Sequence, residues 1–195
     1  SYPDDARRQD NLDLIERALG EHALEYQTVE VPFVTLGGDL PSWAPARRSV
    51  AVLSERGYNQ LATLLDRETI DVQPGEAVEV SVWVNKGGEQ APAGARINLG
   101  ERSFHLSRFV PDNIFPEGAF GRIFVIDEGA FQALAAEGRA ARYYGFHVPQ
   151  WRDAAEAALR ISEAIGYVGE GFQYRSSPDW YKRDELTFKL ILFVG

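Results

Sequence analysis

The sequence predicts an α+β fold in which helices pack on a mixed, mostly antiparallel sheet. Helical periodicity marks both ends of the chain, alternating strand patterns occupy the middle, and a strand followed by a capped helix occurs twice. No linker rich in Pro, Gly or Ser divides the 195 residues. We therefore expect a single domain that covers residues 1–195.

The N-terminal part predicts a helix followed by a strand. In YPDDARRQDNLDLIERALGEHA, Asp4 or Asp5 can cap the helix and Gly20 can supply its C-terminal turn. The apolar residues of one helix face are Leu12, Ile15 and Leu19. The alternation in LEYQTVEVPFVTL indicates a strand, in which Pro32 favours an edge position or a break. The next segment, GGDLPSWAPAR, is typical of a loop and holds Trp43.

The middle of the chain predicts a strand–helix unit and then more strands. RSVAVLS has the pattern of a strand, and Ser54 stands where the N-cap of the following helix belongs. The expected buried stripe of that helix is Tyr58, Leu61, Ala62 and Leu65. AVEVSVWVN is an alternating strand, with valines on one side and Glu79, Ser81 and Trp83 on the other. RINLGERSFHLSRFV predicts a hairpin that turns near Gly100.

The strand–helix unit has a counterpart within the chain. AVLSERGYNQLA, from Ala51, and FVIDEGAFQALA, from Phe124, align without a gap. The alignment places Ser54 opposite Asp127, so that both stand at a helix cap. We expect two related strand–helix units, although any capped strand–helix step produces a similar pattern.

The C-terminal part predicts a strand, a long helix and a further helix start. ARYYGFHVP has a strand pattern, and QWRDAAEAALRISEAIG is amphipathic. The apolar stripe of this helix is Trp151, Ala155, Ala158, Ile161 and Ile165. On its polar face Glu156 and Arg160 are spaced to form a pair one turn apart. In SPDWYKRDELTFKLILFVG, the initial Ser177, Pro178 and Asp179 signal a helix start.

The composition narrows the function classes. Twenty basic and 29 acidic residues give a net charge of −9, which argues against nucleic-acid binding because that requires clustered cations. The charge suits a cationic partner, or serves solubility alone. Cysteine is absent, which removes disulfides and thiolate metal sites. Methionine is absent too, so we expect a processed or excised piece of a longer protein.

The chain lacks the motifs of common catalytic sites. Its histidines, His22, His105 and His147, do not have a metal-binding spacing. The hydrolase motif G-x-S-x-G is missing, and the glycines of IGYVGEGF follow a predicted helix instead of preceding one, as a phosphate-binding loop requires. We predict no catalytic, cofactor-binding or metal-binding residues, no cofactor, and a protein that is not an enzyme.

The apolar ending DELTFKLILFVG admits two interpretations. Alternate residues are apolar as in a core strand: Phe188, Leu190, Leu192 and Val194. The helix-start signal points instead to a helix within 178–195. Its apolar residues are too few to cross a bilayer, which requires about 20, so such a helix would be the beginning of a transmembrane helix. In that case Trp180 and Tyr181 lie at the membrane interface, and Lys189 extends its amine towards water. The pattern alone does not decide between the two interpretations.

The segments SVAVLSERGYNQLATLLDRETIDVQPGEAVEV and DELTFKLILFVG resemble the large extracellular domain of FtsX-like ABC transporter permeases of the bacitracin-resistance (BceB) type. The positions that match the recurrent motif are Ser54, Glu55, Tyr58, Asn59, Leu61, Ala62, Pro74, Gly75 and Glu76. The resemblance covers essentially the whole chain, and its motifs are structural rather than catalytic. It implies one extracellular domain, inserted between the seventh and eighth membrane helices of a bacterial permease.

The resemblance also implies a ligand and partners. The ligand is a peptide antibiotic such as bacitracin, or its complex with a lipid-pyrophosphate precursor of the cell wall. The partners are the transmembrane remainder of the permease, a cytoplasmic subunit that hydrolyses ATP, and a membrane sensor histidine kinase. The negative charge favours a cationic peptide, whereas a pyrophosphate requires a cationic cluster, for which Arg139, Arg142 and Arg152 are candidates. Trp43 is a candidate ligand contact.

Two other functions stay open. The chain is alternatively the extracytoplasmic domain of an FtsX-like cell-division or export permease that docks a partner protein. A free-standing soluble enzyme is the third possibility, and a start codon just before Ser1 with a stop just after Gly195 would support it.

Overall fold

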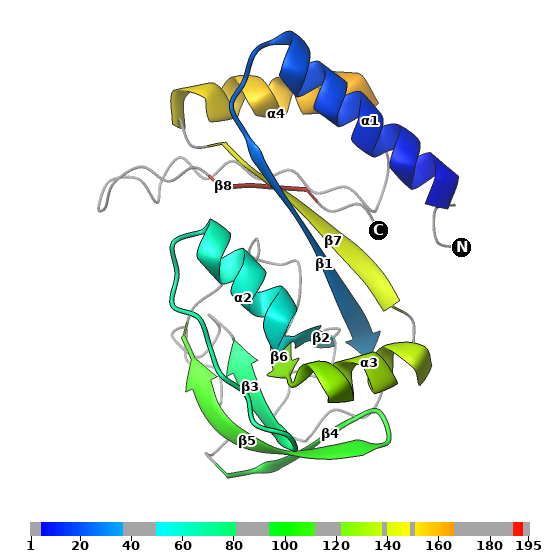
Figure 1. The fold of residues 1–195 in the computed structure, drawn as a ribbon, viewed down its shortest axis with the longest axis vertical. Coiled ribbons are helices and arrows are strands. Elements are labelled where there is room, and N and C mark those ends of the chain that lie inside the picture. Colours follow the sequence, from blue (N-terminus) through cyan, green and yellow to red (C-terminus); the bar gives the residue numbers. More distant parts are fainter. Residues whose placement is uncertain are drawn as a thin grey trace. The chain divides into compact units, whose positions relative to one another are not determined.

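The computed structural model describes residues 5–36, 50–80, 94–111, 122–137, 140–148, 151–165 and 189–192. The chain forms two compact units, which are described separately below. The central unit comprises residues 31–141, and the terminal unit comprises residues 1–30 and 142–195. The boundaries between the units fall within β1 (Gln27–Leu36) and β7 (Ala140–His147). No linker in the sequence marks these positions. Figure 1 labels the elements of both units (Figure 1).

The central unit contains six strands and two helices within its described residues. The strands are β1 (Gln27–Leu36, from Val31 onwards), β2 (Val50–Ser54), β3 (Glu76–Val80), β4 (Arg96–Leu99), β5 (Arg102–Val110) and β6 (Arg122–Ile126). The helices are α2 (Glu55–Leu64) and α3 (Glu128–Glu137). The strand order is β4-β5-β3-β6-β2-β1. β2 pairs with β6 and β3 with β5 in parallel, whereas β1–β2, β3–β6 and β4–β5 are antiparallel. The predicted α+β class with a mixed sheet is confirmed.

The two related strand–helix units are the core of the central sheet. β2 leads into α2 and β6 into α3, and these strands are parallel neighbours. The Ser54 hydroxyl accepts a hydrogen bond from the Gly57 amide at 3.1 Å, and the Asp127 carboxylate accepts one from the Ala130 amide at 3.0 Å. Both predicted caps are therefore present, and each satisfies an amide in the first turn of its helix.

The repeat extends one strand further than the sequence alignment indicates. β1 lies antiparallel to β2 with Phe33 opposite Leu53, and β3 lies antiparallel to β6 with Ala77 opposite Ile126. Leu53 and Ile126 each immediately precede a helix cap. Each repeat is thus strand, strand, helix (β1-β2-α2 and β3-β6-α3), with the β4–β5 hairpin inserted in the second.

The two helices cover opposite faces of the central sheet. In the register of β2 and β6, Ser54 pairs with Ile126, so Ile126 and Leu53 point to opposite faces. α3 packs on the Ile126 face, where its Phe131 joins the same apolar cluster. α2 lies on the Leu53 face, because a Cβ built on Gly57 would meet Val31 Cγ1, two residues before Phe33 on the same side of β1. A rotation of about half a turn around the strand direction thus relates the repeats.

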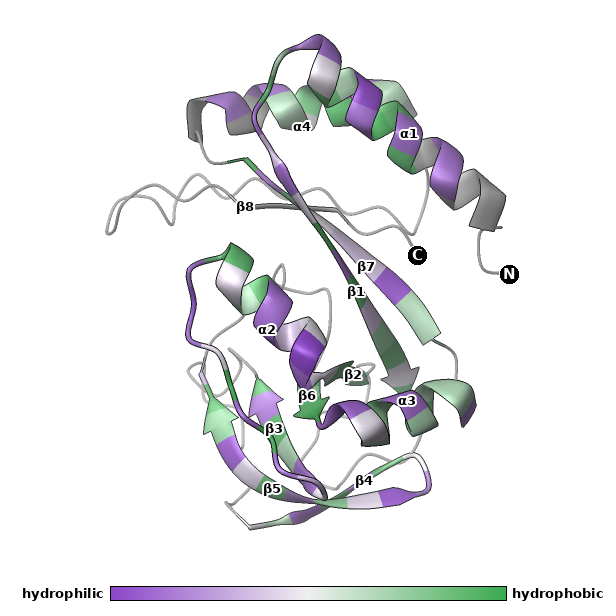
Figure 2. Ribbon diagram, viewed as in Figure 1, coloured by the Kyte–Doolittle hydropathy of each residue, from purple (hydrophilic) through white to green (hydrophobic). Residues whose placement is uncertain are grey.

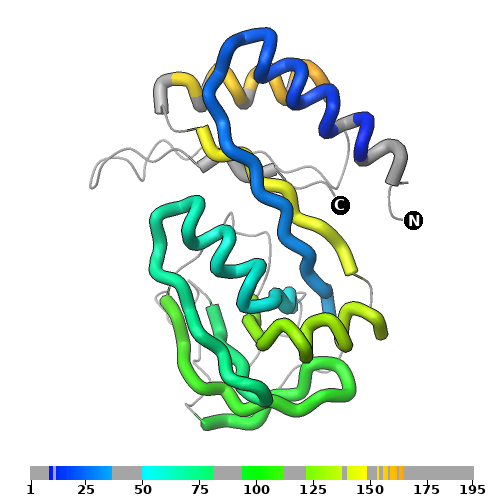
Figure 3. Tube along the Cα trace, in the orientation of Figure 1, coloured from blue at the N-terminus to red at the C-terminus, as the bar shows by residue number. Residues whose placement is uncertain are grey.

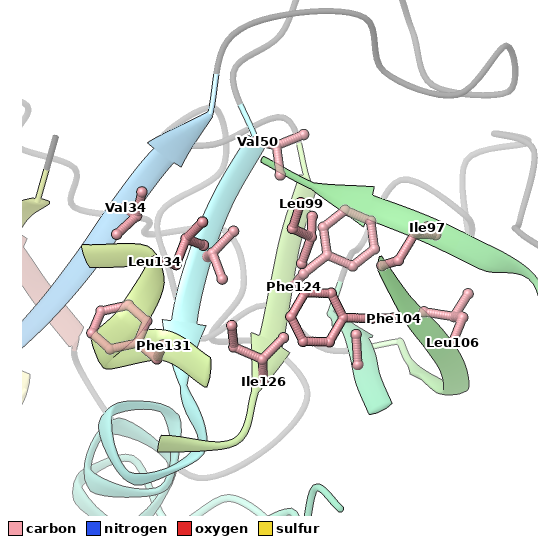
Figure 4. Packing of buried hydrophobic residues seen from close by; sticks show 12 residues of the cluster. Val34, Val50, Ile97, Leu99, Phe104, Leu106, Phe124, Ile126, Phe131 and Leu134 are labelled. Carbon is pink, nitrogen blue, oxygen red and sulfur yellow. The ribbon is translucent and has the colours of Figure 1, made fainter. Parts of the chain in front are cut away.

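A described apolar cluster of the central unit lies beneath α3. It draws residues from all six strands and α3, and Figure 4 shows their side chains directed towards one another (Figure 4). Its buried members are Val34, Val50, Val52, Ala77, Ile97, Leu99, Phe104, Leu106, Phe124, Ile126, Phe131 and Leu134. Burying a residue of this size stabilises the fold by roughly 1.5–3 kcal/mol before the entropic cost of ordering it.

The segment that follows α2 is held against the helix by side chains of the helix. Figure 3 shows the chain leaving α2 and returning alongside it to β3 (Figure 3). Asn59 Nδ2 donates to the carbonyl oxygen of Ile70 and Asn59 Oδ1 accepts from the Ile70 amide, both at 2.8 Å. Glu55 Oε2 accepts from the Val72 amide at 3.2 Å. These side chains replace the main-chain partners that a strand would have supplied.

Two glycines supply turns of the central unit, of which the sequence pattern predicts the one at Gly100. In the Gln73–Glu76 turn the Glu76 amide donates to the Gln73 carbonyl at 2.9 Å, and Gly75 has φ +83°. Proline followed by glycine is the preferred pair for such a type II turn. Gly100 has φ +64° and begins the turn between β4 and β5, where Leu99 pairs with Arg102. The predicted hairpin is confirmed, and Figure 2 shows the alternation of polar and apolar residues along β5 (Figure 2).

The terminal unit contains α1 (Asp5–Glu21), α4 (Trp151–Ile165), most of β7 (Ala140–His147) and β8 (Lys189–Leu192). Its apolar cluster joins both helices to β7, and Ile15, Leu19 and Ile161 occupy it as predicted. The other buried members are Tyr144, Phe146, Val148 and Ala157. On the polar side of α4, Arg160 pairs with Glu156 at 2.7 Å, as the spacing predicts, and also with Glu163 at 2.9 Å.

The end of α1 differs from the sequence prediction. Gly20 lies inside the helix, and the residue in the left-handed conformation is Ala23, with φ +52°. The Leu24 amide donates to the Leu19 carbonyl at 3.1 Å and the Ala23 amide to the Gly20 carbonyl at 3.0 Å, which is a Schellman motif. α2 ends in the same way at Asp66, with φ +51°. Packing of the partly buried Leu24 on the apolar cluster compensates for the unfavourable φ of Ala23.

Two further predictions require correction. Pro32 does not break its strand: β1 is continuous from Gln27 to Leu36, and its paired register with β2 starts directly after the proline, at Phe33. The C-terminal tail is not helical at Lys189–Leu192, because these residues form β8, antiparallel to β7 with His147 opposite Lys189. Strand alternation, the other interpretation of this tail, describes these four residues. Over the described part of the chain, no helix has the length and apolarity needed to cross a bilayer.

Candidate functional site

Five strand ends of the central sheet lie together at one end of the unit. Val50 pairs with Leu36 on one side and with Arg122 on the other. Next to Arg122 in β6, Ile123 pairs with Val80, which in turn pairs with Val110. In the sequence, segment 37–49 joins Leu36 to Val50, segment 112–121 leads from β5 to Arg122, and segment 81–93 follows Val80. We call this the loop-bearing end of the central unit.

The opposite end is closed by short connections. Ser54 passes directly into α2, Asp127 directly into α3, and the turns at Pro74-Gly75 and Gly100-Glu101 join neighbouring elements. Capped helices and tight turns leave little chain free at this end. Longer connections on a rigid sheet are the usual carriers of binding residues, so the loop-bearing end is the candidate functional site of the central unit.

A buried ion pair lies beside the loop-bearing end. Arg122, the first residue of β6, donates from Nη1 to Glu79 Oε1 in β3 at 2.9 Å. The Glu79 side chain is fully buried and the Arg122 side chain is 8 % exposed. In the β3–β6 register Glu79 lies opposite Phe124, so its side chain points to the face that α3 covers. Two charges therefore enter an otherwise apolar layer of the sheet.

The second oxygen of Glu79 distinguishes this pair from an ordinary buried salt bridge. Oε2 has no hydrogen-bond partner among the described residues. Removal from water raises the pKa of the Glu79 carboxyl, and the Arg122 charge, which lowers it, does not cancel the effect. A half-satisfied buried carboxylate is costly, and replacing such a pair by apolar residues is often neutral or stabilising. Stability alone therefore does not explain the presence of the pair.

The sequence pattern did not identify the pair. The sequence pattern places Glu79 on the strand face opposite the valines, with Ser81 and Trp83, but both faces of β3 are buried after Glu76. Arg122 precedes the apolar run IFVI and carries no motif. The sequence offers two isolated signals: an acidic residue, Glu79, within a strand pattern and a basic residue, Arg122, at the start of another. That the two form a pair follows only from the register of β3 and β6.

The predicted ligand-binding residues are only partly within the described residues. Trp43 and Arg139 lie outside them, and Arg152 belongs to α4 without a described side chain. Arg142, in β7, forms an ion pair with Glu30 in β1, and both side chains remain about half exposed. The structure therefore does not bring the three predicted arginines together among its described side chains.

The predicted membrane-interface residues have a similar status. Trp180 and Tyr181 lie outside the described residues, and Lys189 starts β8 without a described side chain.

All nine residues that match the permease motif are described, and they build the β2–α2 unit and the turn into β3. Among the described His, Asp and Glu residues, no group of three is placed to hold a metal ion.

No family model and no curated protein matches the chain. Among solved structures, a chain described as "Putative Lipoprotein from Bacillus anthracis" is similar, with a TM-score of 0.42 and 3% identity. The similarity covers 69% of this chain and 76% of that chain.

Proposed function

We propose that this chain is the extracellular ligand-recognition domain of a bacterial ABC transporter permease that handles peptide antibiotics. In this account the chain performs no catalysis, and ATP is hydrolysed by a separate cytoplasmic subunit. The domain lies at the outer face of the cell membrane and contacts the transmembrane remainder of its permease. Ligand binding to the domain is signalled to a sensor histidine kinase.

The observation that supports a recognition function is the gathering of five strand ends at one end of the central sheet, next to which the segments 37–49, 81–93 and 112–121 stand in the sequence. The strand ends that carry them, from Leu36 to Val110, are adjacent in register. Trp43 belongs to the first of these connecting segments. Loops held by a rigid scaffold supply adaptable contacts, and an amphipathic aromatic ring supplies a large contact area at low entropic cost.

The permease motif supports the same proposal in a different way. Its residues cap α2, fill the face of α2 beneath the sheet, and hold the returning segment through Asn59 and Glu55. The motif thus describes a scaffold and contains no residue of the segments 37–49, 81–93 and 112–121. Segments carried by a rigid scaffold commonly hold the binding residues.

The direct test is calorimetric titration of the 195-residue chain with two ligands, bacitracin and a short-chain isoprenyl pyrophosphate. We expect binding of at least one of them, weakened at least tenfold by Trp43→Ala. The matched control is Glu101→Gln, at the opposite end of the central unit, which should bind as the wild type does.

The other two functions predict different results. A partner-docking domain would bind neither ligand and would instead be retained by the adaptor protein of its own permease. An enzyme would convert a ligand, so heat would continue to be released at saturation. Either result would overturn the proposal.

A further inference from the structure

The apolar pattern of β3 and β6 does not determine how these two strands pair. Every residue of β6 is buried, and so is every residue of β3 after Glu76. A one-residue slip usually turns the apolar face of a strand to solvent, which excludes it. Here a slip would exchange the apolar residues of one buried face for those of the other, with the exceptions of Glu79 and Arg122. These two charged residues are therefore the ones in the buried stretches that can mark a register.

The other neighbour of β3 does not fix its register along the whole strand. In the β3–β5 pairing, Ala77 lies opposite Leu106, and the next residue, Val78, lies opposite Arg108. Ser107 is the extra residue of a bulge, so the register beyond it differs by one residue from the register before it. A one-residue change of register is thus already accommodated beside β3, and the pairing with β6 selects the correct one.

The first repeat marks its register in a different way. The residue of β1 that corresponds to Glu79 is Thr35, because each follows by two positions the partner of the residue before the helix cap. Thr35 is exposed, so a one-residue slip of β1 against β2 would turn the buried Val34 to solvent in its place. Glu79 is fully buried, so contact with solvent does not distinguish the faces at this position of the second repeat.

We propose that the Glu79–Arg122 pair selects the register of β3 against β6 by excluding the two one-residue slips, a role distinct from stabilising the fold. In the observed register Glu79 lies opposite Phe124, and Arg122, two residues earlier in β6, is on the same face. Arg122 Nη1 donates to Glu79 Oε1 at 2.9 Å across this diagonal. This role is independent of the proposed transporter function.

A slip by one residue in either direction separates the two charges. Glu79 would then lie opposite Ile123 or Val125, whose side chains point to the α2 face, whereas Arg122 lies on the α3 face. Glu79 would become a buried carboxylate without its counter-charge, and its Oε2 has no described partner to compensate. Arg122 takes part in a further interaction, so the penalty arises at Glu79. A pair that adds little stability can therefore still exclude slipped pairings.

The experiment is NMR spectroscopy of the double variant Glu79→Leu with Arg122→Met, which keeps both faces apolar and removes the charges that mark the register. In the wild type, main-chain nuclear Overhauser contacts should place Val78 directly opposite Val125, in a single set of signals. In the double variant we expect two sets of amide signals for β3 and β6, the second with Val78 opposite a neighbour of Val125.

Two further variants distinguish this pair from ion pairs in general and from the other interaction of Arg122. Arg102→Met with Glu137→Leu removes an ion pair between partly exposed side chains and should retain the single register. The exchange of Glu79→Arg with Arg122→Glu removes the guanidinium from position 122 but restores opposite charges at the same two positions. We expect the exchange variant to show the single register of the wild type.

Three results would overturn the proposal. A double variant with a single set of signals and the Val78–Val125 contacts of the wild type would mean that the register is fixed without the pair. A double variant that does not fold would mean that the pair is needed for stability itself. Two registers in the exchange variant would mean that opposite charges at positions 79 and 122 do not select the pairing.

Discussion

Asn59 and Ile70 are joined by two hydrogen bonds, both 2.8 Å long, that pair a side-chain amide with a main-chain amide and carbonyl. This arrangement attaches the segment after α2 to the helix and directs the chain into β3. Asn59 is one of the motif positions on which the resemblance to permeases rests, so the motif acquires a physical role in the fold. The site at the loop-bearing end depends on this scaffold.

Replacing Asn59 by alanine should be strongly destabilising. The substitution leaves the N–H and C=O of the buried Ile70 without partners, and each such group costs about 1–3 kcal/mol. We expect a loss of about 2–4 kcal/mol of unfolding free energy in a urea titration. Gln60→Ala, at an exposed position of the same helix, should change stability by less than about 0.5 kcal/mol. Equal effects at both positions would contradict the role of Asn59.

The left-handed residue at the end of α1 predicts a stabilising substitution. Ala23 has φ +52°, a conformation that costs an L-residue with a Cβ roughly 1–2 kcal/mol and glycine almost nothing. Ala23→Gly should therefore raise the unfolding free energy by about 1 kcal/mol. Gly20→Ala should also stabilise, by about 1 kcal/mol, because Gly20 lies in the helix and a Cβ there meets nothing within 4 Å. A loss of stability in either variant would disprove this account of the helix end.

The approach of α2 to β1 predicts a steric effect. A Cβ on Gly57 would lie 2.7 Å from Val31 Cγ1, whereas the equivalent position of the second repeat is occupied by Ala130. Gly57→Ala should destabilise the chain by about 1–3 kcal/mol through overpacking. Thermal unfolding of the pair Gly57→Ala with Val31→Ala should recover part of this loss. Failure of the second substitution to compensate would show that the helix is placed differently.

The buried ion pair predicts a non-additive stability effect. Arg122→Met alone leaves Glu79 buried without its counter-charge, and we expect a loss of about 3–5 kcal/mol at neutral pH. The double variant Glu79→Leu with Arg122→Met should be about as stable as the wild type or more stable. A double-mutant cycle by denaturant titration measures the coupling directly. Additive losses would mean that the two side chains do not act as a pair.

Much of the fold could be predicted because it depends on local signals. Ser54 and Asp127 cap helices whichever sheet they join, Gly100 favours a turn, and the stripe from Tyr58 to Leu65 is periodic. Glu156 and Arg160 meet because they are one helical turn apart. In each of these elements, the residues that interact are only a few positions apart in the sequence, so the local pattern is enough to predict the interaction.

The remaining features depend on contacts between distant segments. Tertiary packing holds Ala23 in a conformation that its local sequence does not favour, and β1 runs through Pro32 because paired register begins after it. Lys189–Leu192 form a strand because β7 provides a partner for it. The sequence does not show this pairing, so it could not decide between the strand and the transmembrane helix. The Glu79–Arg122 pair requires the register of two strands that are 43 residues apart. The candidate site could not be derived because its defining feature is the shared end of five strands.

The measurement that tests the central claim most directly is NMR mapping of ligand binding on the 195-residue chain, with bacitracin and an isoprenyl pyrophosphate added in turn. We expect the amides of Leu36, Val50, Val80 and Val110 to shift on addition of ligand, while those of Gly75 and Gly100 at the opposite end do not. Shifts confined to the opposite end, or the absence of binding by both ligands, would contradict it.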